Sequence, residues 1–187
     1  MSLSLLEWRR TVAELYADVR ATDGEQGHAL WVARRAALFA TSPDSPLQAG
    51  SSLDVPAYDP AWRAVVPLEP AEPEHRTLEG GVGMDRIGVL NTPWGALDAW
   101  WLDEYSGGLF VPVKDATAGQ TSYGAGRYLL DTAKGADLGS GADGVVVDLN
   151  FLYHPSCAYD PRWSCPLAPA GNVLPVAVPV GERLPRG

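Results

Sequence analysis

The stretch Arg86-Ile-Gly-Val-Leu-Asn-Thr-Pro-Trp-Gly-Ala-Leu-Asp-Ala-Trp-Trp-Leu102 contains two β-type runs, 86–90 and 94–102, joined by a turn at 91–94. Its branched and aromatic residues favour strands, and Asn-Thr-Pro favours a turn. No helical period separates the two runs. We therefore expect them to pair as antiparallel neighbours in a sheet.

Similar runs recur about every ten residues through the C-terminal part of the chain. They lie at 62–68, 75–78, 109–113, 127–130, 145–151 and 173–180. Strands at this spacing, without helices between them, indicate an antiparallel β-sandwich or barrel-like core. The Gly-rich segment 133–144 is predicted to be an exposed loop.

Two amphipathic helices are predicted before these strands, at residues 4–21 and 24–40. The apolar stripe of the first contains Leu5, Trp8, Val12, Leu15, Tyr16 and Val19. The stripe of the second contains Leu30, Ala33, Ala37 and Leu38, with Arg34 and Arg35 on the opposite face. His28 in the second helix and His75 at a strand start are expected on the surface.

These elements predict the α+β class, with two N-terminal helices packed on the β core. We expect residues 1–187 to form a single domain. Within it, residues 1–42 form a helical segment and residues 60–184 form the β-rich core.

The charge of the chain limits its partners, because 14 basic and 23 acidic side chains give a net charge of −9. Without a basic stripe, nucleic-acid binding is not expected, and anionic membranes repel the chain. No apolar run has the length of a membrane span, and residues 1–10 do not resemble a signal peptide. The expected location is the cytoplasm, where cysteines are usually reduced.

A first candidate for functional chemistry is the polar segment 112–128, which contains Gly119, Gly124 and Gly126. Glycines allow close backbone approach, and successive N–H groups can bind an anion. The segment lacks the P-loop and dinucleotide fingerprints. Arg127 within it is the natural anchor for a carboxylate or phosphate.

A second candidate is Gly144-Val-Val-Val-Asp-Leu-Asn-Phe-Leu-Tyr-His154. As a continuous strand it would present Asp148, Asn150 and His154 on one face and an apolar surface on the other. In one interpretation, Asp148 forms a structural salt bridge with Arg127, and His154 caps a turn. In the other, these side chains form a polar patch within a cleft, where Asp148 and Arg127 orient a ligand.

The third candidate is the pair Cys157 and Cys165, on either side of Asp160-Pro161. The two residues can be buried thiols or can form a disulfide across the turn. A zinc site with His154 lacks the usual paired cysteine spacing. A nucleophilic Cys157–His154 pair is a further alternative.

These segments together resemble the prokaryotic domain of unknown function 1684 family. The first matching group is Pro112, Asp115, Thr117, Gly119, Tyr123, Gly124, Gly126, Arg127 and Tyr128. The second is Asp148, Asn150, Tyr153, Pro155, Cys157, Ala158, Tyr159, Cys165, Pro166, Pro169, Asn172, Gly181 and Glu182. The chain departs from the family pattern at Leu149 for Phe, His154 for Asn and Gly171 for Glu. The resemblance implies the position of a site and no established activity.

The first functional hypothesis is a small-molecule site, binding or catalytic, built from segments 112–128 and 148–165. It takes a small anionic ligand, and no cofactor is identified. The candidate catalytic residues are Asp115, Tyr123 and Asp148. The candidate ligand-binding residues are Arg127, Asn150, Lys114, Tyr128 and His154.

Two alternatives remain. In the first, the polar residues form an architectural core of an interaction module, and Tyr58-Asp-Pro-Ala-Trp62 supplies a partner or homodimer surface. The second is a divalent-cation site with oxygen ligands from Asp115, Asp148, Asn150 and Glu182.

Overall fold

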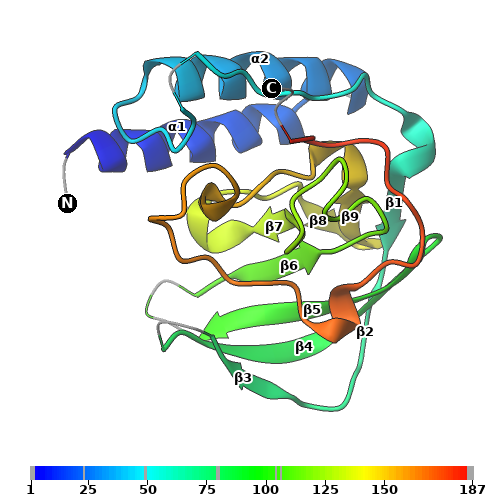
Figure 1. Cartoon of the computed structure of the whole chain (residues 1–187). Helices are drawn as coiled ribbons and strands as arrows, with labels where there is room; N and C mark the ends of the chain where they lie inside the picture. Colours follow the sequence, from blue (N-terminus) through cyan, green and yellow to red (C-terminus); the bar gives the residue numbers. More distant parts are fainter. Residues whose placement is uncertain are drawn as a thin grey trace.

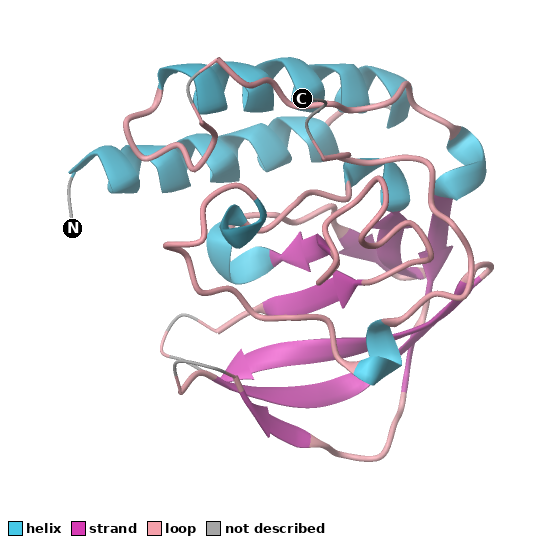
Figure 2. Cartoon of the chain, in the orientation of Figure 1, coloured by secondary structure: helices cyan, strands magenta, loops and turns pink. Residues whose placement is uncertain are grey.

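The computed structural model describes residues 3–22, 24–48, 50–78, 81–103, 105 and 107–184. Two helices lie side by side across one end of the molecule, and the strands lie on one side of them (Figure 1). Long loops connect the strands (Figure 2). The predicted α+β class is confirmed. None of the described helices is both long and apolar enough to cross a membrane.

Both helices begin and end close to their predicted positions, α1 at Leu3–Arg20 and α2 at Gly24–Thr41. The predicted stripe of α1 is correct toward its C-terminal end, where Leu15, Tyr16 and Val19 are buried.

The stripe predicted for α2 is wrong. The residues that α2 buries are Gly27, His28, Trp31, Arg35 and Phe39. The rings of Trp31 and Phe39 have far more apolar surface than the alanines of the predicted stripe. Their burial therefore determines which face of α2 packs against the core. This orientation buries His28 and Arg35, which were expected on the surface, whereas His75 is exposed as expected.

The larger sheet has the strand order β2-β4-β5-β6-β7, and β3 also pairs with β4. Its strands are β2 (Leu68–Glu69), β3 (His75–Thr77), β4 (Gly83–Thr92), β5 (Gly95–Asp103), β6 (Leu109–Val113) and β7 (Arg127–Asp131). The predicted pairing of 86–90 with 94–102 is the β4–β5 hairpin, in which Leu90 lies opposite Leu97.

The smaller sheet has the order β1-β9-β8, formed by β1 (Arg63–Val66), β9 (Gly144–Asp148) and β8 (Ser140–Gly141). Its register places Arg63 opposite Asp148. Strand pairings in both sheets are antiparallel. The two sheets stay open and are sandwich-like.

One hydrophobic core joins the helices to both sheets. Its fully buried members include Trp31 from α2, Leu97 from β5, Leu129 from β7 and Val147 from β9. The Trp31 indole donates a hydrogen bond to the Tyr16 hydroxyl at 3.2 Å, which satisfies its polar N–H inside the core.

Two predicted strands are shorter than expected. The run 62–68 is divided by Pro67, which has no N–H for a sheet, so β1 and β2 belong to different sheets. The run 145–151 ends as a strand at Asp148 and continues as a 3₁₀ turn at Leu149–Phe151. The Asp148 carboxylate caps that turn by accepting the Asn150 N–H at 3.1 Å, so the predicted alternation of faces stops there.

Two other predictions for the C-terminal part need correction. Residues 173–180 do not form a strand, because Pro175 and Pro179 remove two donors. The segment pairs with the chain after β6 through a bridge between Lys114 and Val173 and a hydrogen bond from the Ala116 N–H to the Val176 carbonyl at 3.0 Å. The segment 133–144 is only partly an exposed loop. It contains β8 and buries Ala136 and Leu138.

Two glycines in the hairpin between β8 and β9 can be compared to test whether the backbone requires glycine at one of them. Gly144 has φ +129°, and a Cβ there would lie 2.1 Å from the Val66 carbonyl oxygen. We expect Gly144→Ala to lower the free energy of unfolding by at least about 2 kcal/mol. Gly141→Ala, whose Cβ would meet nothing within 4 Å, should change it by less than about 1 kcal/mol. Urea denaturation measures both, and equal effects would contradict the constraint.

Candidate functional site

The sequence-predicted site residues separate into two buried polar groups. Asp115, Tyr123, Arg127, Tyr128 and His154 lie in or beside the first, which packs against the C-terminal segment. Asp148 and Asn150 lie in the second, near the turn between α1 and α2. The Lys114 backbone pairs with the segment around Val173.

The first group centres on Arg127, the first residue of β7, whose side chain is 1% exposed. Its Nη2 donates to Asp115 Oδ2 at 2.8 Å and to the Val178 carbonyl at 3.1 Å. Its Nη1 donates to the carbonyls of Val180 at 2.6 Å and Glu182 at 3.0 Å. The guanidinium therefore holds an extended segment that has no strand partner.

The Asp115 carboxylate, like the Arg127 guanidinium, forms its hydrogen bonds with groups of the protein. Its Oδ1 accepts the N–H groups of Thr117 at 2.9 Å and Val178 at 3.1 Å. Burial raises the pKa of Asp115, but the Arg127 guanidinium and the bonds from Thr117 outweigh burial and hold it below its usual range. The carboxylate is thus a permanent counterion for Arg127, and the alternative Asp148–Arg127 bridge is replaced by this pair.

Glu182, which is fully buried, connects this region to the helices. Its Oε1 accepts a hydrogen bond from Arg35 Nε. Its Oε2 accepts the Tyr159 hydroxyl at 2.8 Å and the His154 backbone N–H at 2.7 Å. Burial raises the pKa of Glu182, but Arg35 outweighs burial and lowers it below the usual value. The Arg35 guanidinium also lies 4.5 Å from the centre of the Phe39 ring.

His154 is a neutral acceptor in this cluster. Its Nε2 accepts the Tyr123 N–H at 3.1 Å, which places the imidazole proton on Nδ1, 3.4 Å from the Tyr159 hydroxyl. Burial lowers the pKa of His154 to about 4, and the attraction of Glu182 only partly compensates. The side chain therefore fastens the Gly-rich segment.

The two predicted tyrosines make different contacts. Tyr128 is buried and donates to the Pro166 carbonyl at 2.6 Å. Tyr123 is half-buried, and its hydroxyl interacts with the Cys157 thiol. Both therefore attach the region around the cysteines to the sheet.

The second group centres on Asp148, which ends β9. Its Oδ1 accepts the Asn150 side-chain amide at 2.8 Å, and its Oδ2 accepts the Tyr58 hydroxyl at 3.2 Å. Arg63 Nε lies 3.8 Å from Oδ2. Asn150 also bonds both backbone groups of Asp59, at 2.9 Å each. The long connection after α2 is thereby fixed against β9.

This second carboxyl differs from Asp115 in the direction of its pKa shift. Burial raises the pKa of Asp148, and the opposing bonds from Asn150 and Tyr58 do not restore it. Burial and the Asp148 charge raise the pKa of Tyr58 to about 12, so Tyr58 remains a proton donor. His28 lies 3.2 Å from the Asn150 carbonyl and has a pKa lowered by burial.

A pocket of about 150 Å³ opens beside this carboxyl, and we call it the Asp148 pocket. It is lined by Val19, Arg20, Thr22, Gly24, Gly27, Arg63, Leu138, Val146, Asp148 and Phe151. Two guanidinium groups and one carboxylate therefore share a small space. Of the predicted site residues, Asp148 lines it.

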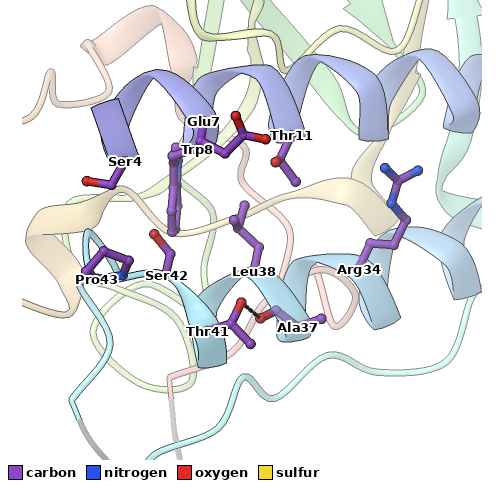
Figure 3. Close-up of a pocket in the computed structure, with 10 residues that line it drawn as sticks. All are labelled: Ser4, Glu7, Trp8, Thr11, Arg34, Ala37, Leu38, Thr41, Ser42 and Pro43. Atoms are coloured by element: carbon purple, nitrogen blue, oxygen red, sulfur yellow. Dashed lines mark hydrogen bonds between the residues drawn. The ribbon is translucent and has the colours of Figure 1, made fainter. Parts of the chain in front are cut away.

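A larger groove of about 450 Å³ lies between α1 and α2, and none of the residues that line it is a predicted site residue (Figure 3). The side chains of Trp8 and Leu38 approach each other across it, with Glu7 and Arg34 along its sides. The Thr41 hydroxyl bonds the Ala37 carbonyl of its own helix at 2.9 Å. The groove is mostly apolar and contains no paired acid and base suited to chemistry.

The carboxylates proposed as cation ligands are divided between the two groups. Asp115 and Glu182 each bond an arginine, and Asp148 lies in the other group. Within the ranges that the structure describes, no three His, Cys, Asp or Glu side chains gather as a metal site would require.

Several residues of both groups were missed from the sequence. Arg35 and Tyr159 belong to the first group, and Tyr58, Arg63 and Arg20 to the second. For Arg35 a signal was available, because it lies four residues from both Trp31 and Phe39 on one helix face. Tyr159 was part of the family pattern but was not assigned to the site, and Tyr58, Arg63 and Arg20 come from distant segments with no local signal.

Comparisons with known proteins agree with the sequence resemblance. The sequence profile described as "Protein of unknown function (DUF1684)" matches residues 50–183. The solution NMR structure of an uncharacterized protein of Haloarcula marismortui is similar, with 29% sequence identity and a TM-score of 0.58. The match covers 81% of this chain and 89% of that one. No curated protein matches the chain.

The pKa of His154 predicts an acid-sensitive fold. Between pH 6.5 and about 4 the unfolded chain takes up a proton on this imidazole while the folded chain does not. The free energy of unfolding should therefore fall across this window as pH decreases, by up to about 3 kcal/mol from His154.

His154→Asn should flatten that profile, leaving a smaller slope to which His28 contributes with the same sign and Asp148, whose pKa is raised, with the opposite sign. His75→Asn, at an exposed position, is the control and should keep the full slope. Urea denaturation at several pH values measures the effect. An unchanged slope in His154→Asn would rule out the assigned protonation state.

A second prediction concerns the contribution of Arg127 to the free energy of unfolding. Arg127→Met leaves the Asp115 carboxylate and three carbonyls buried without their donor, and should cost about 3–5 kcal/mol. Arg76→Met removes an exposed pair with Glu74 and should cost less than about 1 kcal/mol. A loss below about 1 kcal/mol for Arg127→Met in chemical denaturation would show that this network is not required.

Proposed function

The chain belongs to the DUF1684 family of proteins of unknown function, and from that starting point we propose that it binds a small anionic molecule in the Asp148 pocket. The observation that carries the proposal is a buried carboxyl with a raised pKa, facing a pocket that also contains two arginines. Perturbed titratable groups in a concave site favour a functional assignment over a purely structural one.

The guanidinium of Arg63 favours an anion in this pocket despite the acidic chain. Asp148 is the one acid among the described lining residues, and the second arginine of the lining, Arg20, is paired with Asp137 at 3.4 Å. The 3.8 Å between Arg63 and Asp148 exceeds hydrogen-bond distance, so the carboxylate does not occupy the Arg63 donors. A bound carboxylate or phosphate can use them.

The Asp148 carboxyl would bind a different part of the ligand. Asn150 holds one of its oxygens by two hydrogen bonds, which fixes the orientation of the group. Its other oxygen lies beside Tyr58 at 3.2 Å. The carboxyl can accept a hydroxyl or amine proton from the ligand. The combination suits a short acid that carries a hydroxyl or amino group.

Size supports the same class. A pocket of about 150 Å³ is below the range of roughly 300–1,000 Å³ common for drug-sized ligands. It suits a molecule of a few non-hydrogen atoms. The N-terminal end of α2, at Gly24, adds a favourable dipole for an anion.

This proposal narrows the site predicted from the sequence. It keeps Asp148 as the ligand-facing group and Asn150 as its support, and it leaves segment 112–128 out. The four hydrogen bonds of Arg127 go to protein acceptors, which favours the architectural alternative for the motif around it. The part of the family motif around Arg127 would then stabilise the fold, and the part around Asp148 would bind the ligand.

Titration of ¹⁵N-labelled protein with acetate, glycolate, glycine and phosphate tests the proposal by NMR. Glycolate should move the amide signals of residues 20–27, 63 and 148 and should bind more tightly than acetate. Arg63→Gln should weaken binding by roughly tenfold or more, because a charged hydrogen bond is lost. Arg76→Gln, on the exposed strand β3, is the matched control. Shifts confined to other residues, or equal binding by both variants, would exclude this pocket.

A further inference from the structure

The two cysteines lie together in space at a place that the proposed ligand site does not use. Cys157 belongs to the 3₁₀ turn Ser156–Ala158, and its backbone N–H donates to Cys165 Sγ at 3.4 Å. The thiols are close enough for Cys165 to raise the pKa of Cys157. Both cysteines are free and half-buried, so solvent can reach the pair.

The chain between them is a compact turn. The N–H groups of Tyr159 and Asp160 bond the Ser156 carbonyl at 3.1 and 3.0 Å, and Trp163 N–H bonds the Asp160 carbonyl at 3.1 Å. This turn brings the two sulfurs within reach of each other without any change in the sheets. A sulfur that lies 3.4 Å from the backbone nitrogen of the other cysteine is close enough for the two side chains to meet.

The same turn contributes to the buried polar cluster. Tyr159, between the cysteines, donates to Glu182 at 2.8 Å. Pro166, next to Cys165, accepts the Tyr128 hydroxyl at 2.6 Å. A covalent bond across segment 157–165 would therefore hold these anchors in place.

We propose that Cys157 and Cys165 are a redox pair that closes to an intramolecular disulfide on reaction with a low-molecular-weight disulfide such as glutathione disulfide. Burial and the neighbouring Cys165 thiol raise the pKa of Cys157 to about 11, so Cys157 stays protonated at neutral pH. The first attack is assigned to Cys165, because its Sγ accepts the Cys157 backbone N–H at 3.4 Å, a contact that favours a negative charge on this sulfur.

The reaction has two exchange steps. Cys165, as its thiolate, attacks one sulfur of glutathione disulfide and releases one glutathione thiolate. Cys157 then loses its proton to solvent and attacks the Cys165 sulfur of the mixed disulfide, which releases the second glutathione thiolate. Two cysteine thiols are oxidised, and one glutathione disulfide is reduced to two glutathione molecules.

Intact-mass spectrometry of the full chain with glutathione disulfide tests the proposal. The wild type should lose two hydrogen atoms and retain no glutathione. Trypsin cleaves after the exposed Arg162, between the two cysteines, so the oxidised protein should give two peptides joined by a disulfide. Cys157→Ser should instead accumulate glutathione on Cys165, and Cys165→Ser should react more slowly.

Thermal unfolding gives an independent readout. Oxidation should raise Tm by roughly 5–10 °C, because the bond restricts the unfolded chain, and dithiothreitol should reverse the rise. The double variant Cys157→Ser/Cys165→Ser should show no such shift. A wild type that keeps its mass, or that stops at the glutathione mixed disulfide, would overturn the proposal, as would a fall in Tm on closure.

Discussion

The fold depends on the guanidinium of Arg127, a charge that is almost completely removed from solvent. Burial of such a group is costly unless its charge is paired and its donors are satisfied. Asp115 provides the opposite charge, and three carbonyls of residues 178–182 accept the remaining bonds of its two Nη atoms. Those carbonyls lack strand partners, since the prolines in this segment prevent a regular sheet edge. The two Nη groups of the arginine and the carbonyls of the segment therefore satisfy each other, whereas Arg127 Nε is buried without a hydrogen-bond partner.

The hydrogen bonds between Arg127, Asp115 and residues 178–182 explain why the two polar groups, although similar in composition, differ in hydrogen bonding and in open space. In the Arg127 group, acids and bases are matched by short hydrogen bonds, and the space between them is filled. In the Asp148 group, the arginine is farther from the carboxylate and an open pocket separates the α1–α2 turn from β9. An acidic protein can attract an anion to a pocket that contains arginines because nearby charges dominate the field within a screening length.

Much of the architecture could be predicted from local patterns, and the residues that fix the site could not. The β4–β5 hairpin and α1 follow from alternation and helical spacing, which are properties of single segments. The face of α2 was misjudged because Arg35 was treated as a surface charge, although Trp31 and Phe39 fix its orientation. Asp148 and Asn150 were identified by their unusual place in an apolar run, but the turn that they form ends the strand. Tyr58 lies 90 residues before Asp148, and only the folded chain brings the two together.

The position of Glu182 has a consequence for synthesis on the ribosome. The helix that contains Arg35 and the strand that begins with Arg127 both emerge well before residues 178–182. Until those residues follow, Arg35 lacks its carboxylate and Arg127, although paired with Asp115, lacks its three carbonyls, so a nascent chain with both sheets complete still contains one cation without its counterion and one with unfilled donors. Such an intermediate exposes polar and apolar surface together and is open to chaperones or misassembly. The last step of folding is therefore the packing of the short irregular segment 178–182, which can occur only after these residues have been translated.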